Sequence, residues 1–278
     1  MLQVGKKQEL VIVKKVNFGV YLAEAQDASD RVLLPQKEVP EDADIGTRLC
    51  VFLYRDSQDR MIATLREPML ELGGLAVLKV ADVGRIGAFL DWGLEKDLLL
   101  PFKQQTRRVH PGESCLVALY QDKSGRLCAT MNVYEFLSTD SPYHKDDRVQ
   151  GTIYQTSSEF GVFVAVDNRY SGLIPQREAA GQYRIGDSIS LRVTGVKQDG
   201  KLDLSAREKV EVQIDQDAEA IMKVIEEYEG VLPFSDRVSP EIIKREFGMS
   251  KAAFKRGVGR LYSQGRIEIL ENRIKKVK

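Results

Sequence analysis

A short phrase in this chain places an aromatic residue on either side of a glycine, and it reads Phe160-Gly161-Val162-Phe163 in its fullest form. Exposed aromatic rings stack on nucleobases, with about 1–3 kcal/mol per base and little sequence preference. In a regular strand the two rings would point to opposite faces, but a glycine between them permits a bulge or a sharp bend. We therefore expect Phe160 and Phe163 on one outer face, with Val162 and Val164 pointing inward.

The phrase recurs twice earlier in the chain, and each copy is followed by the same sequence features in the same order. These are an apolar pair before a proline, a turn glycine, an alternating strand, and a final turn and strand. The prolines are 66 and 74 residues apart, and the turn glycines keep the same two intervals. Several sequence features that recur at the same intervals indicate an internal repeat. The earlier copies are Phe18-Gly19-Val20-Tyr21 with Pro35 and Gly46, and Ile86-Gly87-Ala88-Phe89 with Pro101 and Gly112; the third copy continues to Pro175 and Gly186.

The sequence of each repeat predicts about five short strands with turns between them and little helix. Some sixty residues are too few for a β-sandwich, whereas a small five-stranded barrel of the OB type fits and leaves no exposed strand edge. We predict three such barrels in tandem, over residues 1–66, 67–138 and 145–207.

The pattern changes to helix after Ser205, and the new segment carries clear start and stop signals. Its expected elements are a helix from Asp217 to Tyr228, a second from Pro240 to near Phe247, a third from Lys251 to about Ser263, and a hairpin that turns at Glu271-Asn272. Three helices and a hairpin predict a winged-helix domain over residues 213–278. The predicted fold class is mainly β with a C-terminal α+β module.

The third repeat resembles the S1 RNA-binding domain in its order of FGVFV, GLIP, GD, an alternating strand and DGKLDLS. The first two repeats look like diverged copies of it. Three such domains followed by a helical basic tail resemble the conserved virulence factor B family of bacterial RNA-binding proteins. This resemblance covers essentially the whole chain.

The resemblance implies a nucleic-acid face on each barrel, built from the aromatic pair and from residues around the last turn. The second repeat has Ile86 in place of the first ring, and all three repeats have proline where many S1 domains place a histidine. The third repeat carries lysine at the turn position where the others have Asp56 and Asp122, so its face is expected to be the most basic. The implied contacts are Phe18, Tyr21 and Arg60; Phe89 and Arg126; and Phe160, Phe163, Lys197 and Lys201.

Charge is segregated in the tail. Three basic residues stand against nine acidic ones from Lys209 to Ile243, and eleven against three from Lys244 to Lys278. On the last helix, apolar residues fall on one side and basic residues on the other. Two glycines there, Gly257 and Gly259, either admit a sugar-phosphate backbone or ease packing against another helix. The expected phosphate contacts in this domain are Lys251, Lys255, Arg256, Arg260, Arg273 and Lys275.

Composition argues against several classes of function. The 41 basic and 41 acidic side chains cancel, so affinity for a polyanion must come from charge placement. Three cysteines without CxxC spacing favour a reducing cytosol, and no apolar run approaches the roughly eighteen residues of a membrane span. Two histidines are too few for a His-based metal site, and no motif pairs a nucleophile with a base. We expect a cytoplasmic protein without catalysis, metal, other cofactor or membrane contact.

Three functions fit these observations. The first is an RNA-binding protein, a post-transcriptional or expression regulator that binds single-stranded RNA through several weak modules in tandem. The second is a DNA-binding transcriptional regulator that recognises duplex through the winged helix. The third is an adaptor that docks on the ribosome or another protein. The repeated aromatics favour the first, because splayed single-stranded bases reach such rings better than a duplex groove does.

Overall fold

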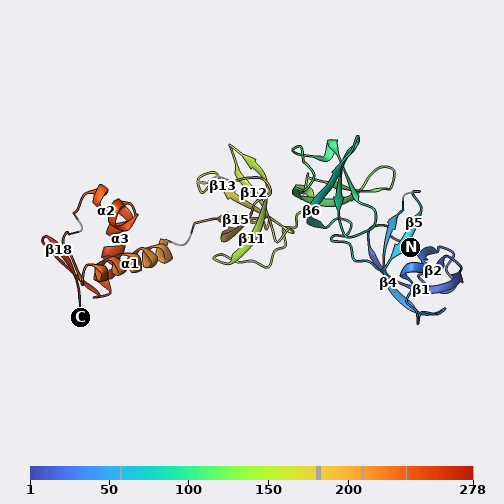
Figure 1. The fold of residues 1–278 in the computed structure, drawn as a ribbon, viewed down its shortest axis with the longest axis horizontal. Helices are drawn as coiled ribbons and strands as arrows, with labels where there is room; N and C mark the ends of the chain where they lie inside the picture. Colours follow the sequence, from blue (N-terminus) through green and yellow to red (C-terminus); the bar gives the residue numbers. More distant parts are fainter. Residues whose placement is uncertain (57, 180–182, 208–209, 236, 278) are drawn as a thin grey trace. The chain divides into compact units, whose positions relative to one another are not determined.

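The computed structural model describes residues 1–56, 58–179, 183–207, 210–235 and 237–277, and the chain forms two compact units (Figure 1). The first unit runs from Met1 to Ala206 and the second from Arg207 to Lys278. Each unit has hydrophobic cores of its own.

The first unit contains three five-stranded sheets built on one plan, which confirms the predicted mainly β class. In each sheet the first strand pairs antiparallel with the second and the fourth. The first and third sheets close into barrels through a parallel pairing of their third and fifth strands, and in the second sheet the equivalent β8 and β10 lie next to each other. The strands are β1 Lys7–Val16, β2 Gly19–Ala23, β3 Val32–Pro35, β4 Arg48–Arg55 and β5 Met61–Thr64; β6 Leu75–Val83, β7 Gly87–Asp91, β8 Leu98–Pro101, β9 Ser114–Gln121 and β10 Leu127–Thr130; and β11 Arg148–Ser157, β12 Gly161–Val166, β13 Tyr170–Pro175, β14 Ser188–Val196 and β15 Leu202–Ser205.

The glycine of the repeated phrase is required by a close approach of two backbones. At Gly161, φ is 116°, and an added Cβ would lie 2.1 Å from the carbonyl oxygen of Ile174. Gly19 and Gly87 meet the equivalent carbonyl at 2.1 and 2.2 Å. Of the bulge or sharp bend expected at this glycine, the bulge is wrong, because the shift in pairing lies on the preceding strand, between Ile153 and Gln155. A side chain at the glycine would push the second strand off the third, which explains why the glycine and the apolar–proline phrase recur together.

Strand β4 is buried on both faces, which joins the first barrel to the second. Successive residues of a strand point to opposite sides. Val51 and Leu53 pack into the first barrel's own core, whereas Phe52 and Tyr54 pack into the core of the second. The Phe52 ring lies edge-on to Trp92, with ring centres 5.8 Å apart. The two barrels therefore share a hydrophobic core.

A further cluster joins the second barrel to the third. It contains Leu116 and Ala118 on the outer side of β9, Leu137 from the connecting segment, and Tyr154 and Ala165 from the third barrel. A 3₁₀ turn, η3 Tyr134–Phe136, lies in this connection. The connecting segment is thus packed into the unit by apolar contacts.

The second unit has the predicted three helices and hairpin. They are α1 Val210–Glu227, β16 Val231–Leu232, α2 Pro240–Phe247, α3 Lys251–Ser263, β17 Ile267–Leu270 and β18 Arg273–Lys276. Helix α2 ends at Gly248 in a left-handed conformation, and the Ser250 hydroxyl accepts a hydrogen bond from the Ala253 backbone N–H at the start of α3. Helix α1 begins seven residues earlier than expected. A short strand, β16, which was not predicted, adds a third strand to the hairpin.

Candidate nucleic-acid interface

The two ring positions of the repeated phrase have different surroundings in all three barrels. The first position precedes the second strand and is open to solvent, with 58% of Phe18, 62% of Ile86 and 57% of Phe160 exposed. The second position lies within the strand and is half-buried: Tyr21, Phe89 and Phe163. The valines predicted to face inward, Val162 and Val164, are buried.

In the third barrel, strand register places the second ring in a row of outward-facing side chains. Phe163 pairs with Leu173 on β13, and Leu173 pairs in parallel with Asp203 on β15. Paired residues project from the same face of a sheet, and all three are half-buried while their strand neighbours are buried. Lys197 extends this row through an ion pair with Asp203 at 3.3 Å. An aromatic ring and a cation therefore lie on one outer face.

Phe163 also has a packing role. Its ring centre lies 6.1 Å from that of Tyr154, at an interplanar angle of 46°. It packs partly against the apolar cluster between the second and third barrels. Phe160 thus presents an open ring, whereas Phe163 presents only part of one.

The cations expected on the barrels all have acidic partners. Lys201 donates a hydrogen bond to the Asp199 carboxylate at 2.7 Å, which holds the pKa of Asp199 below its usual value. With Lys197 held by Asp203, the excess of positive charge expected on the third barrel is offset locally. In the first barrel, Arg60 donates twice to Asp56, at 2.9 and 2.7 Å.

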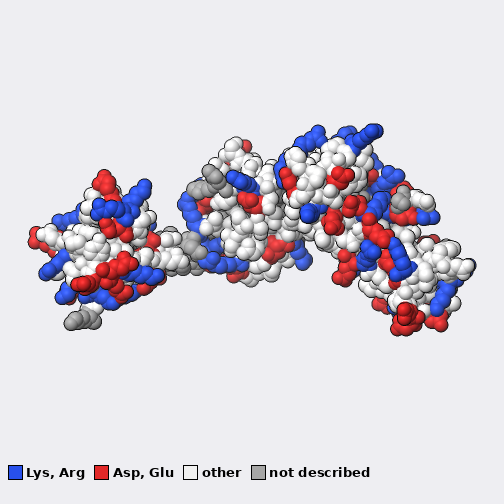
Figure 2. Space-filling model, in the orientation of Figure 1, with Lys and Arg blue, Asp and Glu red and all other residues white. Residues whose placement is uncertain are grey.

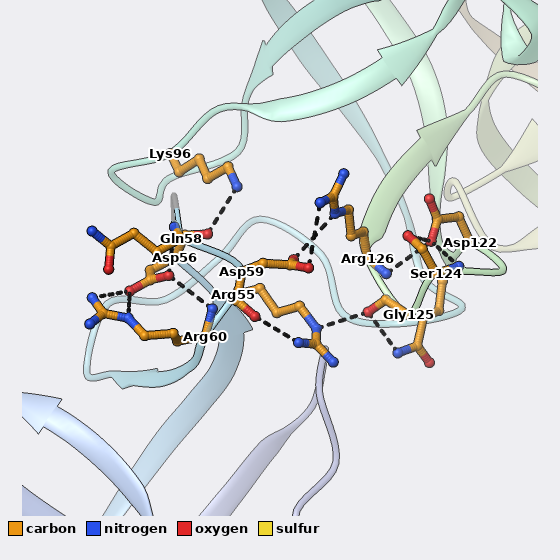
Figure 3. Close-up of polar contacts among 11 residues, drawn as sticks. Arg55, Asp56, Gln58, Asp59, Arg60, Lys96, Asp122, Ser124, Gly125 and Arg126 are labelled. Carbon is orange, nitrogen blue, oxygen red and sulfur yellow. Dashed lines mark hydrogen bonds and ion pairs between the residues drawn. The ribbon is translucent and has the colours of Figure 1, made fainter.

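Arg126 of the second barrel forms its ion pair with a residue of the first barrel. Its guanidinium donates to both carboxylate oxygens of Asp59, at 3.3 and 3.5 Å, and Asp59 belongs to the last turn of the first barrel (Figure 3). Figure 3 shows the two turns facing each other. This contact was not foreseen from the sequence.

Tyr134 is an aromatic residue at this surface that the repeat pattern does not contain. It lies in η3, outside the barrel motif, and 47% of it is exposed. The Lys201 Nζ atom lies 5.8 Å from the centre of its ring. Nearby, Gly200 lies against the Thr139 carbonyl, so the connecting segment borders the last turn of the third barrel. Nothing in the repeat pattern of the sequence points to this residue.

Helix α3 separates an apolar face from a basic one, as predicted. Phe254, Val258 and Leu261 are buried in the core of the second unit, while Lys255 and Arg256 are exposed.

The two glycines of α3 have different roles. An added Cβ at Gly257 would lie 2.6 Å from the Ile221 Cδ1 atom of α1, so this glycine permits close helix packing. A Cβ at Gly259 would meet nothing within 4 Å. A groove of about 290 Å³ opens at Gly259 and is lined by Ile214, Arg256 and Arg260 among others. Packing therefore accounts for Gly257 but not for Gly259.

Helix α1 supplies acidic partners to part of the basic half of the tail. Arg260 donates to Asp215 at 2.6 and 3.1 Å, and Arg266 pairs with Glu219. On the face shown in Figure 2, basic and acidic side chains lie interspersed. Within the described ranges, the expected contacts that form no ion pair are Lys251, Lys255, Arg256, Arg273 and Lys275.

Among the residues that the structure describes, no group of three or more histidine, cysteine or acidic side chains is arranged to hold a metal ion. In the same residues, no helix is both long and apolar enough to cross a membrane.

Comparisons with known proteins cover nearly the whole chain. Family models match as S1 domain at residues 4–66 and 72–132, as "Virulence regulatory factor CvfB, second domain" at 135–208, and as "CvfB-like winged helix domain" at 219–275. A solved structure, a multidomain protein with nucleic acid binding domains from Streptococcus pneumoniae, has the same fold, with a TM-score of 0.50 and 21% identity over 99% of this chain and 98% of that one. The S1 domains support nucleic-acid binding by this chain.

Two relatives match over most of their length. "Uncharacterized protein YitL" of Bacillus subtilis is 31% identical over 95% of this chain and 90% of its own. "Conserved virulence factor B" of Staphylococcus aureus is 31% identical over 88% of this chain and 85% of its own. With matches of this identity and extent, the chain belongs to the conserved virulence factor B family.

Proposed function

We propose that the protein is a non-catalytic, cytoplasmic regulator of expression that binds single-stranded RNA, with the third barrel as its main contact. The row formed by Phe163, Leu173 and Asp203, with Lys197 at its end, carries this proposal. An aromatic ring beside a cation suits a base followed by its phosphate. The names of the matched families and relatives, which describe virulence factors and a virulence regulatory factor, support a regulatory role.

The pairing of the barrel cations favours stacking as the main source of affinity. Lys197 and Lys201 must each leave an acidic partner, or share it, to contact a phosphate. Exposed ion pairs of this kind contribute little, so the exchange is readily reversible. Phe160 needs no such exchange because its ring is already open.

The test compares binding of a 5′-labelled unstructured RNA with binding of a DNA duplex of equal length, by fluorescence anisotropy of the full chain. Tighter binding of the RNA is expected, because open bases can stack and paired bases cannot. Equal or tighter binding of the duplex would contradict the proposal. Phe160→Ala should weaken binding of the RNA, and Ile45→Ala is its control, since Ile45 is an apolar side chain that is also 57% exposed and lies outside the proposed contacts.

A second candidate is duplex DNA binding through α3. It is favoured by the exposed Lys255 and Arg256 beside the open position of Gly259. Loss of duplex binding in a Lys255→Ala/Arg256→Ala variant, with RNA binding retained, would support it.

A further inference from the structure

The last turn of each barrel ends on a basic residue, Arg60, Arg126 or Lys201, and the acidic partners of these three side chains lie in different places. In the first and third barrels the partner lies in the same turn: Asp56 for Arg60 and Asp199 for Lys201. In the second barrel, the Asp122 carboxylate accepts bonds from its own turn, from Ser124 and from the Arg126 backbone N–H. The Arg126 guanidinium reaches Asp59 of the first barrel instead.

Several hydrogen bonds hold these two turns together. The Arg55 guanidinium donates to the Gly125 carbonyl at 3.1 Å and to the Asp59 carbonyl at 2.8 Å, so it bridges both turns. Lys96 of the second barrel donates to the Asp56 carbonyl at 3.2 Å (Figure 3). Asp59 itself has a left-handed backbone, with φ of 65°. Its carboxylate is therefore positioned by backbone contacts as well as by Arg126.

The shared core fixes the first barrel at this place. Phe52 and Tyr54 are buried in the core of the second barrel, on the strand that leads into the turn carrying Asp59. Separating the turns would expose both rings to water, which is unfavourable for large apolar side chains. The contact between the turns is thus built into the fold.

This contact reshapes the outer face of the second barrel. Ile86 and Phe89, at the ring positions of the repeated phrase, line one side of a cleft of about 260 Å³. Tyr54, Arg55 and Asp59 of the first barrel line the other side. The face that would be free on all sides in an isolated barrel is here one wall of this cleft.

We infer that the Asp59 carboxylate takes the place of a phosphate at Arg126, so that the first barrel competes with a nucleic-acid strand for this side chain of the second. A guanidinium presents the same fork of donors to a carboxylate as to a phosphate. While Asp59 holds that fork, Arg126 is not open to a phosphate, and the exposed Lys123 is the other cation of this turn. The inference rests on the proposed function, and it makes the middle barrel a docking surface for the first barrel.

Two substitutions release Arg126 in the full chain: Asp59→Asn and Asp59→Gly. Asparagine and glycine both tolerate the left-handed backbone of this position. With the labelled RNA, each is expected to bind about twofold to fivefold more tightly than wild type, the change for one gained exposed charge contact. The log–log salt dependence should steepen by about 0.7 for one added single-strand phosphate. Asp42→Asn removes an exposed acid elsewhere on the first barrel. It should raise the RNA affinity less than the Asp59 substitutions do, and it should not steepen the log–log salt dependence.

Arg126→Ala makes the test specific. In the wild-type background it should change the affinity less than twofold, and in the Asp59→Asn background it should remove the gain. Equal affinity and slope in wild type and both Asp59 variants would overturn the inference, and so would a clear loss of affinity in Arg126→Ala alone. A wild-type protein that does not bind the RNA would contradict the proposed function. If the Asp59 variants alone then bind the RNA, the competition between Asp59 and a phosphate at Arg126 would still be supported.

Discussion

Phe160 and Phe163 come from one motif, yet they have different surroundings. Phe160 precedes its strand and is open to solvent, while Phe163 lies within the strand and packs on Tyr154. Alternation along a strand predicted which residues point inward, and the buried Val162 and Val164 confirm it. It could not predict that the second barrel and the connecting segment pack against part of the outer face, because their residues lie outside the third repeat.

We expect Phe160→Ala and Phe163→Ala to differ in stability more than in binding. Phe160→Ala should cost about 1–3 kcal/mol in RNA affinity through lost stacking, with the unfolding free energy within about 0.5 kcal/mol of wild type. Phe163→Ala should also destabilise the fold by about 1–2 kcal/mol, because a half-buried ring is lost. Anisotropy and urea unfolding measure the two effects. Unchanged affinity in folded Phe160→Ala would remove this residue from the interface.

Tyr134 gives a second test at the residue scale. Tyr134→Ala should weaken RNA binding by about 1–3 kcal/mol if its ring stacks on a base beside Lys201. Tyr134→Phe keeps the ring and should bind like wild type, which separates stacking from loss of the hydroxyl. If Tyr134→Phe binds as weakly as Tyr134→Ala, the hydroxyl rather than the ring makes the contact.

At the scale of elements, helix α3 combines a packing glycine and an open one, and they should respond in opposite ways to alanine. Gly257→Ala should destabilise the second unit by about 1–3 kcal/mol, because its Cβ would collide with Ile221. Gly259→Ala should stabilise it by up to about 1 kcal/mol, because alanine is the better helix former and the site is open. Thermal unfolding of the two variants measures both. A destabilised Gly259→Ala would mean that this position is under a constraint not seen here.

The exposed cations of α3 should contribute to binding through charge alone. Lys255→Ala/Arg256→Ala should make the log–log salt dependence shallower by about 0.7 for each lost contact to a single strand. Arg266→Ala is the control, because Arg266 is already paired with Glu219. An unchanged slope in the double variant would show that α3 does not touch the nucleic-acid backbone.

Element boundaries were predictable wherever a local residue sets them. Ser250 and Gly248 marked the helix ends, and Glu271-Asn272 marked the hairpin turn, because caps and turns depend on nearby residues. The start of α1 was missed by seven residues, since only its later turns carry the apolar face used to predict it. A bulge was one of two alternatives expected at the glycine; the shift in pairing lies on the preceding strand instead, and the glycine serves a close backbone approach.

At the scale of the whole chain, the tandem plan was predictable and the contacts between its modules were not. The repeat period identified three barrels of one type, and the resemblance to the conserved virulence factor B family is confirmed. The segment CVFLY in β4 predicts a strand whose side chains alternate between inside and outside. The structure instead has four consecutive buried residues there, because a barrel lies on either side of the strand. Likewise, the pairing of Arg126 with Asp59 joins residues 67 positions apart in two different repeats. Period and composition carry no information about such pairs.

The two-sided burial of β4 has a consequence for how this protein can be divided. A fragment ending at Arg66 would contain all five strands of the first barrel, but it would leave Phe52 and Tyr54 exposed side by side. Exposed apolar patches of this kind promote self-association. A fragment that contains the first barrel therefore has to extend past β10 to cover Phe52 and Tyr54, so that the repeat visible in the sequence is shorter than the piece that buries these two rings.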